Sequence, residues 1–298
     1  MGHIENLSGV FPPVATPFKD EQVALEQLAE NIIKYNTTDL KGYMILGSNG
    51  EFRSVTDDEA LKIADVVARN KKPDKILIAG AARESTYATI EFIEKLSDLG
   101  VDYVAILAPH YFVGKMTDEA LIRHYTSVAD QSKIPITVYN APKFSAGLLI
   151  SPQVIAALAD HPNIVGLKDT SKEDIAQYVN AVPKNAEFAV LAGTINKFYE
   201  GLLKGAVGGV LSLADYLPQK CCELQQAFLA GDQAKASQMD EYLRALSSRA
   251  AGKYGVAGLK AAMDLLGYYG GPPRLPLVSI ADSDKGQLEA VLKNEGLL

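Results

Sequence analysis

The chain has 298 residues, of which 48% are hydrophobic and 22% are charged, so it can bury a large core and is not intrinsically disordered. Its formal net charge of −7 disfavours a nucleic-acid backbone or an acidic membrane surface as a partner. A small-molecule partner is therefore expected. The length suits either two ordinary domains or one large α/β barrel.

Several features favour a cytoplasmic protein. The first residues lack the basic start and apolar run of a secretion signal, and no stretch approaches the roughly 18 uncharged apolar residues of a membrane span. The two cysteines, Cys221 and Cys222, are adjacent and cannot readily form a disulfide with each other, which fits a reducing compartment. The four histidines are scattered without metal-ligand spacing, so no metal site is expected.

In chain order, eight short apolar runs rich in Val, Ile and Leu alternate with longer amphipathic segments, a rhythm typical of βαβ units. The predicted strands cover residues 10–17, 42–46, 76–80, 103–108, 136–140, 164–168, 188–192 and 209–213. Thr56 and Thr117, each followed by acidic residues, mark helix starts between strands. Eight such units are the number that closes a (β/α)8 barrel. The rival, an open doubly wound sheet, usually carries a glycine fingerprint after its first strand, and none is present here.

The last part of the chain has helical periodicity and no further strand signal. The predicted helices cover residues 219–230, 233–251, 258–266 and 284–294. We therefore expect a barrel domain over residues 1–217. Residues 218–298 are expected to supply helices that complete the barrel and form a C-terminal helical extension.

Lys168 ends one of the predicted strands, where a barrel of this kind carries its active site. Because side chains alternate along a strand, Ile164, Gly166 and Lys168 are expected to share the face that points into the barrel. Burial lowers the pKa of an amine, so that its neutral form can attack a carbonyl carbon. The sequence thus predicts a Schiff-base lysine. The alternative is a strand-end lysine that reaches solvent or pairs with Asp169.

Two further features accompany this lysine. Tyr139 closes the preceding strand, so both strand ends can converge on one small ligand, and a phenol in a dry site can relay protons. The loop 47–51, Gly-Ser-Asn-Gly-Glu, follows a strand, and its backbone N–H groups with Ser48 and Asn49 can cradle a carboxylate. Taken separately, Tyr139 is typical of a packed core tyrosine and the loop of a plain turn. Together, an amine, a phenol and an anion cradle describe a site for a 2-oxo acid.

The motifs at 47–51, 139–142 and 166–169, in that order and at those separations, resemble the pyruvate-dependent class I aldolases grouped with dihydrodipicolinate synthase and N-acetylneuraminate lyase. The resemblance covers nearly the whole chain. It implies a (β/α)8 barrel with a C-terminal helical extension, pyruvate as a substrate, no metal or organic cofactor, and a homotetramer built as a dimer of dimers. Within the family, the segments 47–52, 161–166, 191–193 and 267–272 are most similar to 4-hydroxy-2-oxoglutarate aldolase.

The resemblance also implies roles for individual residues. Lys168 would form the Schiff base, and Tyr139 would shuttle protons during imine formation and carbon–carbon bond cleavage. Ser48 and Asn49 would hold the pyruvate carboxylate. Tyr111 falls where the family often has a tyrosine that reaches the neighbouring subunit's site. Thr170, Gly193 and Val210 match positions that line the substrate pocket.

One departure from the family bears on the substrate. The synthase branch typically has two threonines in the cradle and, two residues past its Tyr-Asn-x-Pro motif, an arginine that binds the aldehyde partner's carboxylate. This chain has Phe144 at that position, and strand alternation is expected to aim Lys143 elsewhere. We therefore expect cleavage of a 4-hydroxy-2-oxo acid, such as 4-hydroxy-2-oxoglutarate, to pyruvate and an aldehyde. The alternatives are 4-hydroxy-tetrahydrodipicolinate synthesis, another sugar-acid aldolase such as N-acetylneuraminate lyase, or a binding barrel that has lost turnover.

Overall fold

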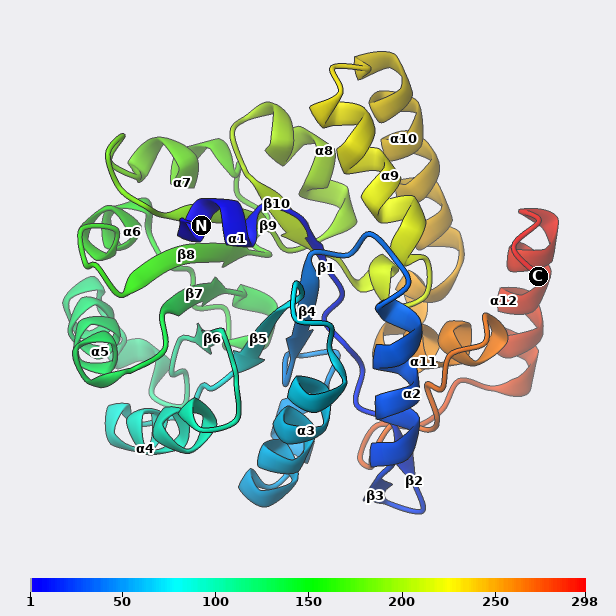
Figure 1. Ribbon diagram of the computed structural model, residues 1–298, viewed down its shortest axis with the longest axis horizontal. Helices are drawn as coiled ribbons and strands as arrows, with labels where there is room; N and C mark the ends of the chain where they lie inside the picture. The colour runs from blue at the N-terminus through cyan, green and yellow to red at the C-terminus, as the bar shows by residue number, and fades with distance from the viewer. Residues whose placement is uncertain (1) are drawn as a thin grey trace.

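The computed structural model describes residues 2–298 and shows a closed barrel of eight parallel strands surrounded by helices (Figure 1). The barrel strands are β1 (Val10–Phe11), β4 (Gly42–Ile45), β5 (Ile76–Gly80), β6 (Tyr103–Leu107), β7 (Ile136–Asn140), β8 (Ile164–Asp169), β9 (Ala189–Ala192) and β10 (Gly208–Val210). They pair in the order β1-β10-β9-β8-β7-β6-β5-β4. The Lys41 and Met44 amides donate to the Val10 and Pro12 carbonyls, each at 3.0 Å, and thereby join β4 to β1. The predicted (β/α)8 fold is confirmed.

Within residues 2–298, eight helices follow the strands, and they cover the outside of the sheet (Figure 1). They are α2 (Leu25–Tyr35), α3 (Asp57–Asn70), α4 (Thr86–Ser97), α5 (Asp118–Gln131), α6 (Pro152–Leu158), α7 (Ala176–Ala181), α8 (Ile195–Leu203) and α9 (Pro218–Leu229). The predicted starts are confirmed where the sequence carries a cap. The Thr56 hydroxyl accepts from the Glu59 amide and the Glu59 carboxylate accepts from the Thr56 amide, so two otherwise unpaired amides of the first turn are satisfied.

A separate layer of apolar side chains fills the barrel interior. It contains Phe11, Met44, Ile78, Tyr103, Ala105, Val165, Ala189, Leu191 and Val210, together with Leu7 from the short helix α1 (His3–Leu7). The Asn6 amide donates to the Tyr103 hydroxyl at 3.0 Å, which ties α1 to the barrel wall. The amino-terminal helix therefore closes one end of the barrel, and the opposite end remains for chemistry.

The first strand is much shorter than predicted. β1 ends at Phe11 because Pro12 and Pro13 have no backbone N–H to donate to a neighbouring strand. The chain then forms a small antiparallel hairpin of β2 (Phe18–Lys19) and β3 (Gln22–Val23), which the apolar pattern did not predict. Its turn residues, Asp20 and Glu21, have φ of 50° and 60°, in the left-handed region.

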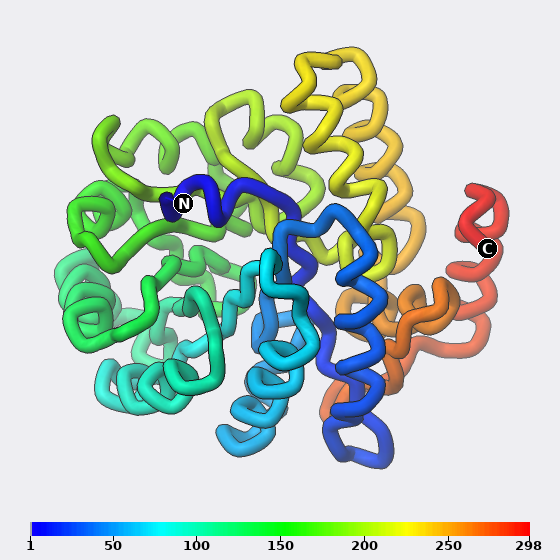
Figure 2. The backbone as a smooth tube through the Cα atoms, in the orientation of Figure 1, coloured from blue at the N-terminus to red at the C-terminus, as the bar shows by residue number. Residues whose placement is uncertain are grey.

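The C-terminal part is helical, as predicted. Beyond α9 lie α10 (Gln233–Arg249), α11 (Gly255–Leu265) and α12 (Asp282–Asn294), within a few residues of the expected bounds. Helix α10 runs beside α9, and α12 lies at the outer edge of the molecule (Figure 2). None of the helices in residues 2–298 is long and apolar enough to cross a membrane.

Candidate active site

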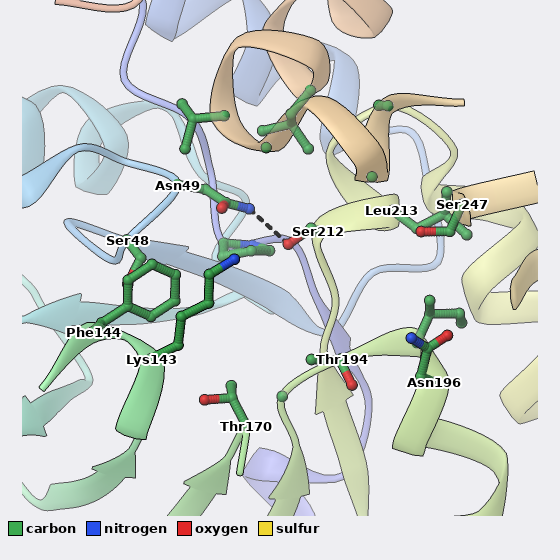
Figure 3. Close-up of a pocket in the computed structure, with 18 of the residues that line it drawn as sticks. Ser48, Asn49, Lys143, Phe144, Thr170, Thr194, Asn196, Ser212, Leu213 and Ser247 are labelled. Carbon is green, nitrogen blue, oxygen red and sulfur yellow. Dashed lines mark hydrogen bonds between the residues drawn. The ribbon is translucent and has the colours of Figure 1, made fainter. Parts of the chain in front are cut away.

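A cavity of about 640 Å³ opens at the carboxyl ends of the barrel strands (Figure 3). Six of the residues predicted from the sequence line it, namely Ser48, Asn49, Tyr139, Lys168, Thr170 and Gly193. They come from the ends of β4, β7, β8 and β9, which lie far apart along the chain. The closed barrel brings them together, as expected for this fold.

Lys168 points into the barrel and is only 4% exposed. Its Nζ lies 3.4 Å from the Met44 thioether sulfur and 4.2 Å from the centroid of the Tyr139 ring. Burial lowers the pKa of the Lys168 amine to about 7, and the electrostatic interaction with Asp215 opposes part of that shift. The side chain of a solvent-exposed lysine is almost entirely protonated near pH 7, whereas a large fraction of the Lys168 side chain is the neutral amine. This amine is therefore available as a nucleophile.

The predicted alternation along β8 is wrong at one residue. β8 pairs Ile164 with Ile136 and Gly166 with Thr137, so Val165 is an extra residue in the strand, a β-bulge. Val165 packs inside the barrel, and Ile164 packs in the core between strands and helices. Because the bulge precedes Gly166, the inward direction of Lys168 is unaffected.

Tyr139 sits opposite Lys168 on the neighbouring strand, since the two residues are register partners. The phenol is 5% exposed, and its hydroxyl lies 3.4 Å from the Ser48 hydroxyl. Burial raises the pKa of Tyr139, while hydrogen bonding from the Ser48 and Thr170 side chains moderates the rise. The phenol therefore keeps its proton at neutral pH and can pass it along hydroxyl groups.

The residues that follow Tyr139 and Lys168 lock the two strand ends together. The Asn140 amide donates to the Asp169 carboxylate and to the Tyr178 hydroxyl, each at 2.9 Å. Asp169 is fully buried and also forms an ion pair with Lys197. This network lies behind the cavity and fixes the relative position of the amine and the phenol. The predicted alternative, in which Lys168 pairs with Asp169, does not occur.

The loop after β4 has the geometry of an anion cradle. Leu46 and Glu51, at its two ends, have φ of 56° and 52°, so the chain turns sharply between them. The Thr16 hydroxyl donates to the Gly50 carbonyl at 2.7 Å, and the Asn49 side chain donates to the Ser212 hydroxyl at 2.8 Å. Within residues 2–298, the backbone amides at 48 and 49 have no hydrogen-bond acceptor. They remain available to a ligand carboxylate.

A buried ion pair anchors this loop to the C-terminal extension. The Lys260 ammonium lies 2.5 Å from the Glu51 carboxylate, and both side chains are 1% exposed. The other Glu51 oxygen accepts from the Arg274 backbone amide at 2.9 Å. The Arg274 guanidinium in turn forms a two-pronged contact with Glu59, at 2.7 and 2.8 Å. Sequence reasoning missed this network because its members are distant along the chain.

The three residues assigned to the pocket walls lie in different environments. Thr170 and Gly193 line the cavity and face each other closely. A Cβ added at Gly193 would lie 2.2 Å from the Thr170 methyl, so no larger residue fits there. Val210 packs in the barrel interior and is not among the residues that line the cavity.

Tyr111 lies outside the cavity of its own chain. Its side chain is 78% exposed and packs edge-on against Phe112, which is 68% exposed. The Glu84 carboxylate accepts from the Tyr111 backbone amide at 3.0 Å and holds the segment in place. Any contact of this phenol with an active site would have to be with another copy of the chain.

The outer part of the cavity is positively charged, which the sequence did not predict. Its lining includes Lys143 and Lys253 in addition to Lys168, and no aspartate or glutamate in the described chain lines it. Lys143 belongs to the 3-10 turn Pro142–Phe144 rather than to a strand, so the alternation rule does not apply. Figure 3 shows its side chain pointing into the cavity, which corrects the expectation that it would be aimed elsewhere. Phe144 lines the same wall.

Asp215 is a second residue that the sequence analysis missed. It ends the 3-10 turn Ser212–Asp215 after β10 and is fully buried. One carboxyl oxygen accepts from the Ala15 amide at 3.2 Å, and the other has no hydrogen-bond partner in the part of the chain that the structure describes. Burial raises the pKa of Asp215 to about 8, although the Ala15 amide, the Asn49 side chain and Lys168 act in the opposite direction. The sequence signal that could have identified Asp215 is that it is the single acidic residue in the largely apolar run 208–217.

Comparisons with known proteins identify relatives over nearly the whole length. Residues 6–295 match the model of the dihydrodipicolinate synthetase family. An uncharacterized DapA-like lyase of Halobacterium salinarum is 34% identical over 98% of this chain and 95% of the relative. A 4-hydroxy-tetrahydrodipicolinate synthase of Methanothrix thermoacetophila is 31% identical over 95% of each chain.

A solved structure agrees with this assignment. The structure of YagE, a prophage protein of Escherichia coli K12 that belongs to the dihydrodipicolinic acid synthase family, was determined in complex with pyruvate. It superposes with a TM-score of 0.90 at 27% identity and covers 98% of this chain and 99% of that protein.

Proposed function

This chain belongs to the dihydrodipicolinate synthetase family and is a pyruvate-dependent carbon–carbon lyase, and from that premise we propose that it reversibly cleaves a 4-hydroxy-2-oxo acid to pyruvate and an aldehyde through an imine on Lys168. The observation that carries the proposal is the juxtaposition of a buried amine with a pKa of about 7 and a buried phenol, at one end of a cavity with an anion cradle.

The first step is attack of the neutral Lys168 amine on the ketone carbon. Loss of the ketone oxygen as water leaves a protonated imine, which withdraws electrons from the substrate. The bond between C3 and C4 can then break, because its electron pair forms an enamine rather than a free carbanion. Hydrolysis of the imine formed from this enamine releases pyruvate.

Tyr139 supplies and accepts the protons of this sequence. As the C3–C4 bond breaks, the C4 hydroxyl loses its proton while the aldehyde forms, and the enamine later gains a proton. The Tyr139 hydroxyl and the Ser48 hydroxyl, 3.4 Å apart, form a path for both transfers. The amides of residues 48 and 49 would hold the carboxylate beside the ketone and so fix the orientation of the reacting carbon.

The aldehyde is the second product of the cleavage. We propose that it carries a carboxylate, as glyoxylate from 4-hydroxy-2-oxoglutarate does, and that Lys143 contacts this group. Lys143 lines the cavity beyond Lys168, and no acidic side chain of the described chain shares that lining. The Lys143 ammonium, a compact charge on a flexible side chain, would take the place of the planar guanidinium that the synthase branch has at the position of Phe144.

Synthesis of 4-hydroxy-tetrahydrodipicolinate is an equally supported candidate, because relatives at 31% identity carry that name. Its aldehyde, aspartate semialdehyde, also carries a carboxylate. Turnover distinguishes the two candidates: pyruvate release from 4-hydroxy-2-oxoglutarate supports aldol cleavage, whereas efficient condensation of pyruvate with aspartate semialdehyde, without that release, contradicts it.

Variants test the role of Lys143 within whichever reaction is found. Lys143→Gln should raise KM for a carboxylate-bearing partner by about tenfold and leave KM for an uncharged aldehyde unchanged. Lys172→Gln, an exposed lysine that does not line the cavity, is the matched control. Equal KM values for Lys143→Gln and wild type would exclude the assigned contact.

We further propose that the enzyme is a homotetramer in which Tyr111 reaches the site of a neighbouring subunit. The exposure of Tyr111 and Phe112 supports this assignment, because large aromatic side chains seldom remain in solvent without a partner. Mixing inactive Lys168→Met subunits with impaired Tyr111→Ala subunits should restore activity, since some hybrid sites receive both intact residues. Absence of any restoration in confirmed hybrids would contradict the shared site.

A further inference from the structure

Asp215 is a buried carboxyl group that the proposed mechanism, with imine formation at Lys168 and proton transfer at Tyr139, does not use. Four carboxyl groups are buried in residues 2–298: Glu51, Asp169, Asp215 and Asp240. Three of them contact a cation, in the pairs Glu51–Lys260, Asp169–Lys197 and Asp240–Arg244. Asp215 has no such contact, although an unpaired buried carboxylate is costly.

Asp215 lies directly behind the lining of the active-site cavity. Ser212 and Leu213, just before it, and Tyr216, just after it, all line the cavity. The Ala15 amide donates to one of its carboxyl oxygens, and the Tyr35 hydroxyl donates to its backbone carbonyl at 2.5 Å. The group is therefore held firmly, and one of its carboxyl oxygens has no hydrogen-bond partner among the described residues.

Lys168 is the buried lysine that, in the described chain, forms neither an ion pair nor a hydrogen bond to an oxygen acceptor. Of the other buried lysines in the described chain, Lys260 pairs with Glu51, and Lys75 donates to two backbone carbonyls, at 2.6 and 3.1 Å. Among residues 2–298, Lys168 has only the Met44 sulfur within hydrogen-bond distance. Once this amine becomes a protonated imine, it carries a positive charge at a side chain that is only 4% exposed, and an opposite charge nearby would stabilise it.

We propose, on the premise that Lys168 forms the imine, that Asp215 holds a proton in the resting enzyme and releases it as the imine forms, so that its carboxylate balances the charge of the protonated imine. The nitrogen of Lys168 forms a bond to the ketone carbon, and the carbon–oxygen bond breaks. The oxygen leaves as water with one proton from the amine and, in net terms, one from Asp215. The products are one protonated imine, one carboxylate and one water.

The other groups that face Asp215 do not exchange this proton. They are Tyr35 on α2, Tyr216 between the 3-10 turn and α9, Cys221 in α9, and Tyr268 after α11. Burial raises the pKa of each of them, so all four remain neutral through the physiological range. Lys168, with a pKa of about 7, and Asp215, with a pKa of about 8, therefore form a pair that holds one proton between these values.

The number of protons taken up when pyruvate binds tests this directly in the wild-type enzyme. Titration calorimetry at a pH between 7 and 8, in buffers of different ionisation enthalpy, measures that number. We expect a value near zero, because the pair holds one proton before and after imine formation. Uptake of about one proton from solution would overturn the proposal, since Asp215 would then have kept its own.

Asp215→Asn supplies the second readout, because asparagine still offers an acceptor to the Ala15 amide. This variant should take up close to one proton, and it should need about tenfold or more pyruvate for half-maximal trapping by borohydride. Asp240→Asn, which removes a buried carboxyl outside the cavity lining, should behave as wild type in both assays. Wild-type trapping by Asp215→Asn would overturn the assignment.

The two proposals fail in different ways. Wild-type enzyme that forms no adduct at all overturns the aldolase mechanism and this inference with it. Wild-type enzyme that forms the adduct with uptake of one proton overturns the role of Asp215 alone. If Asp215→Asn does not fold, the wild-type proton count still decides.

Discussion

Replacing Lys260 with methionine should leave the Glu51 carboxylate buried without a contacting cation. Both side chains are 1% exposed and lie 2.5 Å apart, so neither is screened by solvent. Removing one partner of such a pair costs about 3–5 kcal/mol, because the remaining charge stays desolvated. Glu51 keeps only the Arg274 backbone amide, at 2.9 Å. We therefore expect a loss of this size in the free energy of unfolding.

The double variant separates charge from packing. In Glu51→Gln/Lys260→Met the site holds no charge, and glutamine can still accept from the Arg274 amide. Its loss should be much smaller than the sum of the two single losses, because the pair is coupled. Urea denaturation followed by far-ultraviolet circular dichroism suits this chain, which has no tryptophan. Lys204→Met, at an exposed pair with Glu200, should hardly move the midpoint.

The pair should also affect substrate binding, because Glu51 ends the carboxylate loop. Loosening of that loop in Lys260→Met should raise KM for pyruvate more than it lowers kcat. Strictly additive losses of stability in the double variant, or unchanged KM in Lys260→Met, would show that the extension does not support the loop.

Two further predictions concern the reacting groups. Tyr139→Phe should lower kcat by about 10²–10⁴-fold and still allow pyruvate to be trapped on Lys168, so unchanged turnover would exclude the proton role. Because the pKa of Lys168 falls from 10.5 in the unfolded chain to about 7 in the folded protein, this side chain binds more protons in the unfolded state between those values. Its contribution to stability should therefore rise with pH across that window, and up to about pH 8 the raised pKa of Asp215 opposes part of the rise. Lys168→Met should abolish activity and remove that rise, which amounts to at most about 5 kcal/mol; equal pH dependence of wild type and variant would contradict the buried amine.

The sequence was sufficient to predict the barrel because its strands are short apolar runs with clear boundaries. The length of the first strand was predicted wrongly because Pro12 and Pro13, although apolar, have no backbone N–H and end β1 early. The bulge at Val165 shows a second limit, since no pattern of side chains in β8 distinguishes an extra residue from regular alternation.

The central site residues were predictable for a related reason. Lys168 and Tyr139 each end a strand, and a barrel gathers strand ends at one place. Lys143 was misjudged because a turn obeys no alternation. Glu51–Lys260 and Asp215 depend on contacts between distant segments, which one sequence without its fold does not contain.

Formation of a covalent adduct with pyruvate tests the central claim most directly. Incubation with pyruvate and borohydride, followed by mass spectrometry of the digested protein, should place one reduced pyruvate on Lys168 and none on Lys143 or Lys253, which line the same cavity. Lys168→Met should acquire no adduct. An unmodified Lys168, or an adduct that persists in Lys168→Met, would contradict the proposed chemistry.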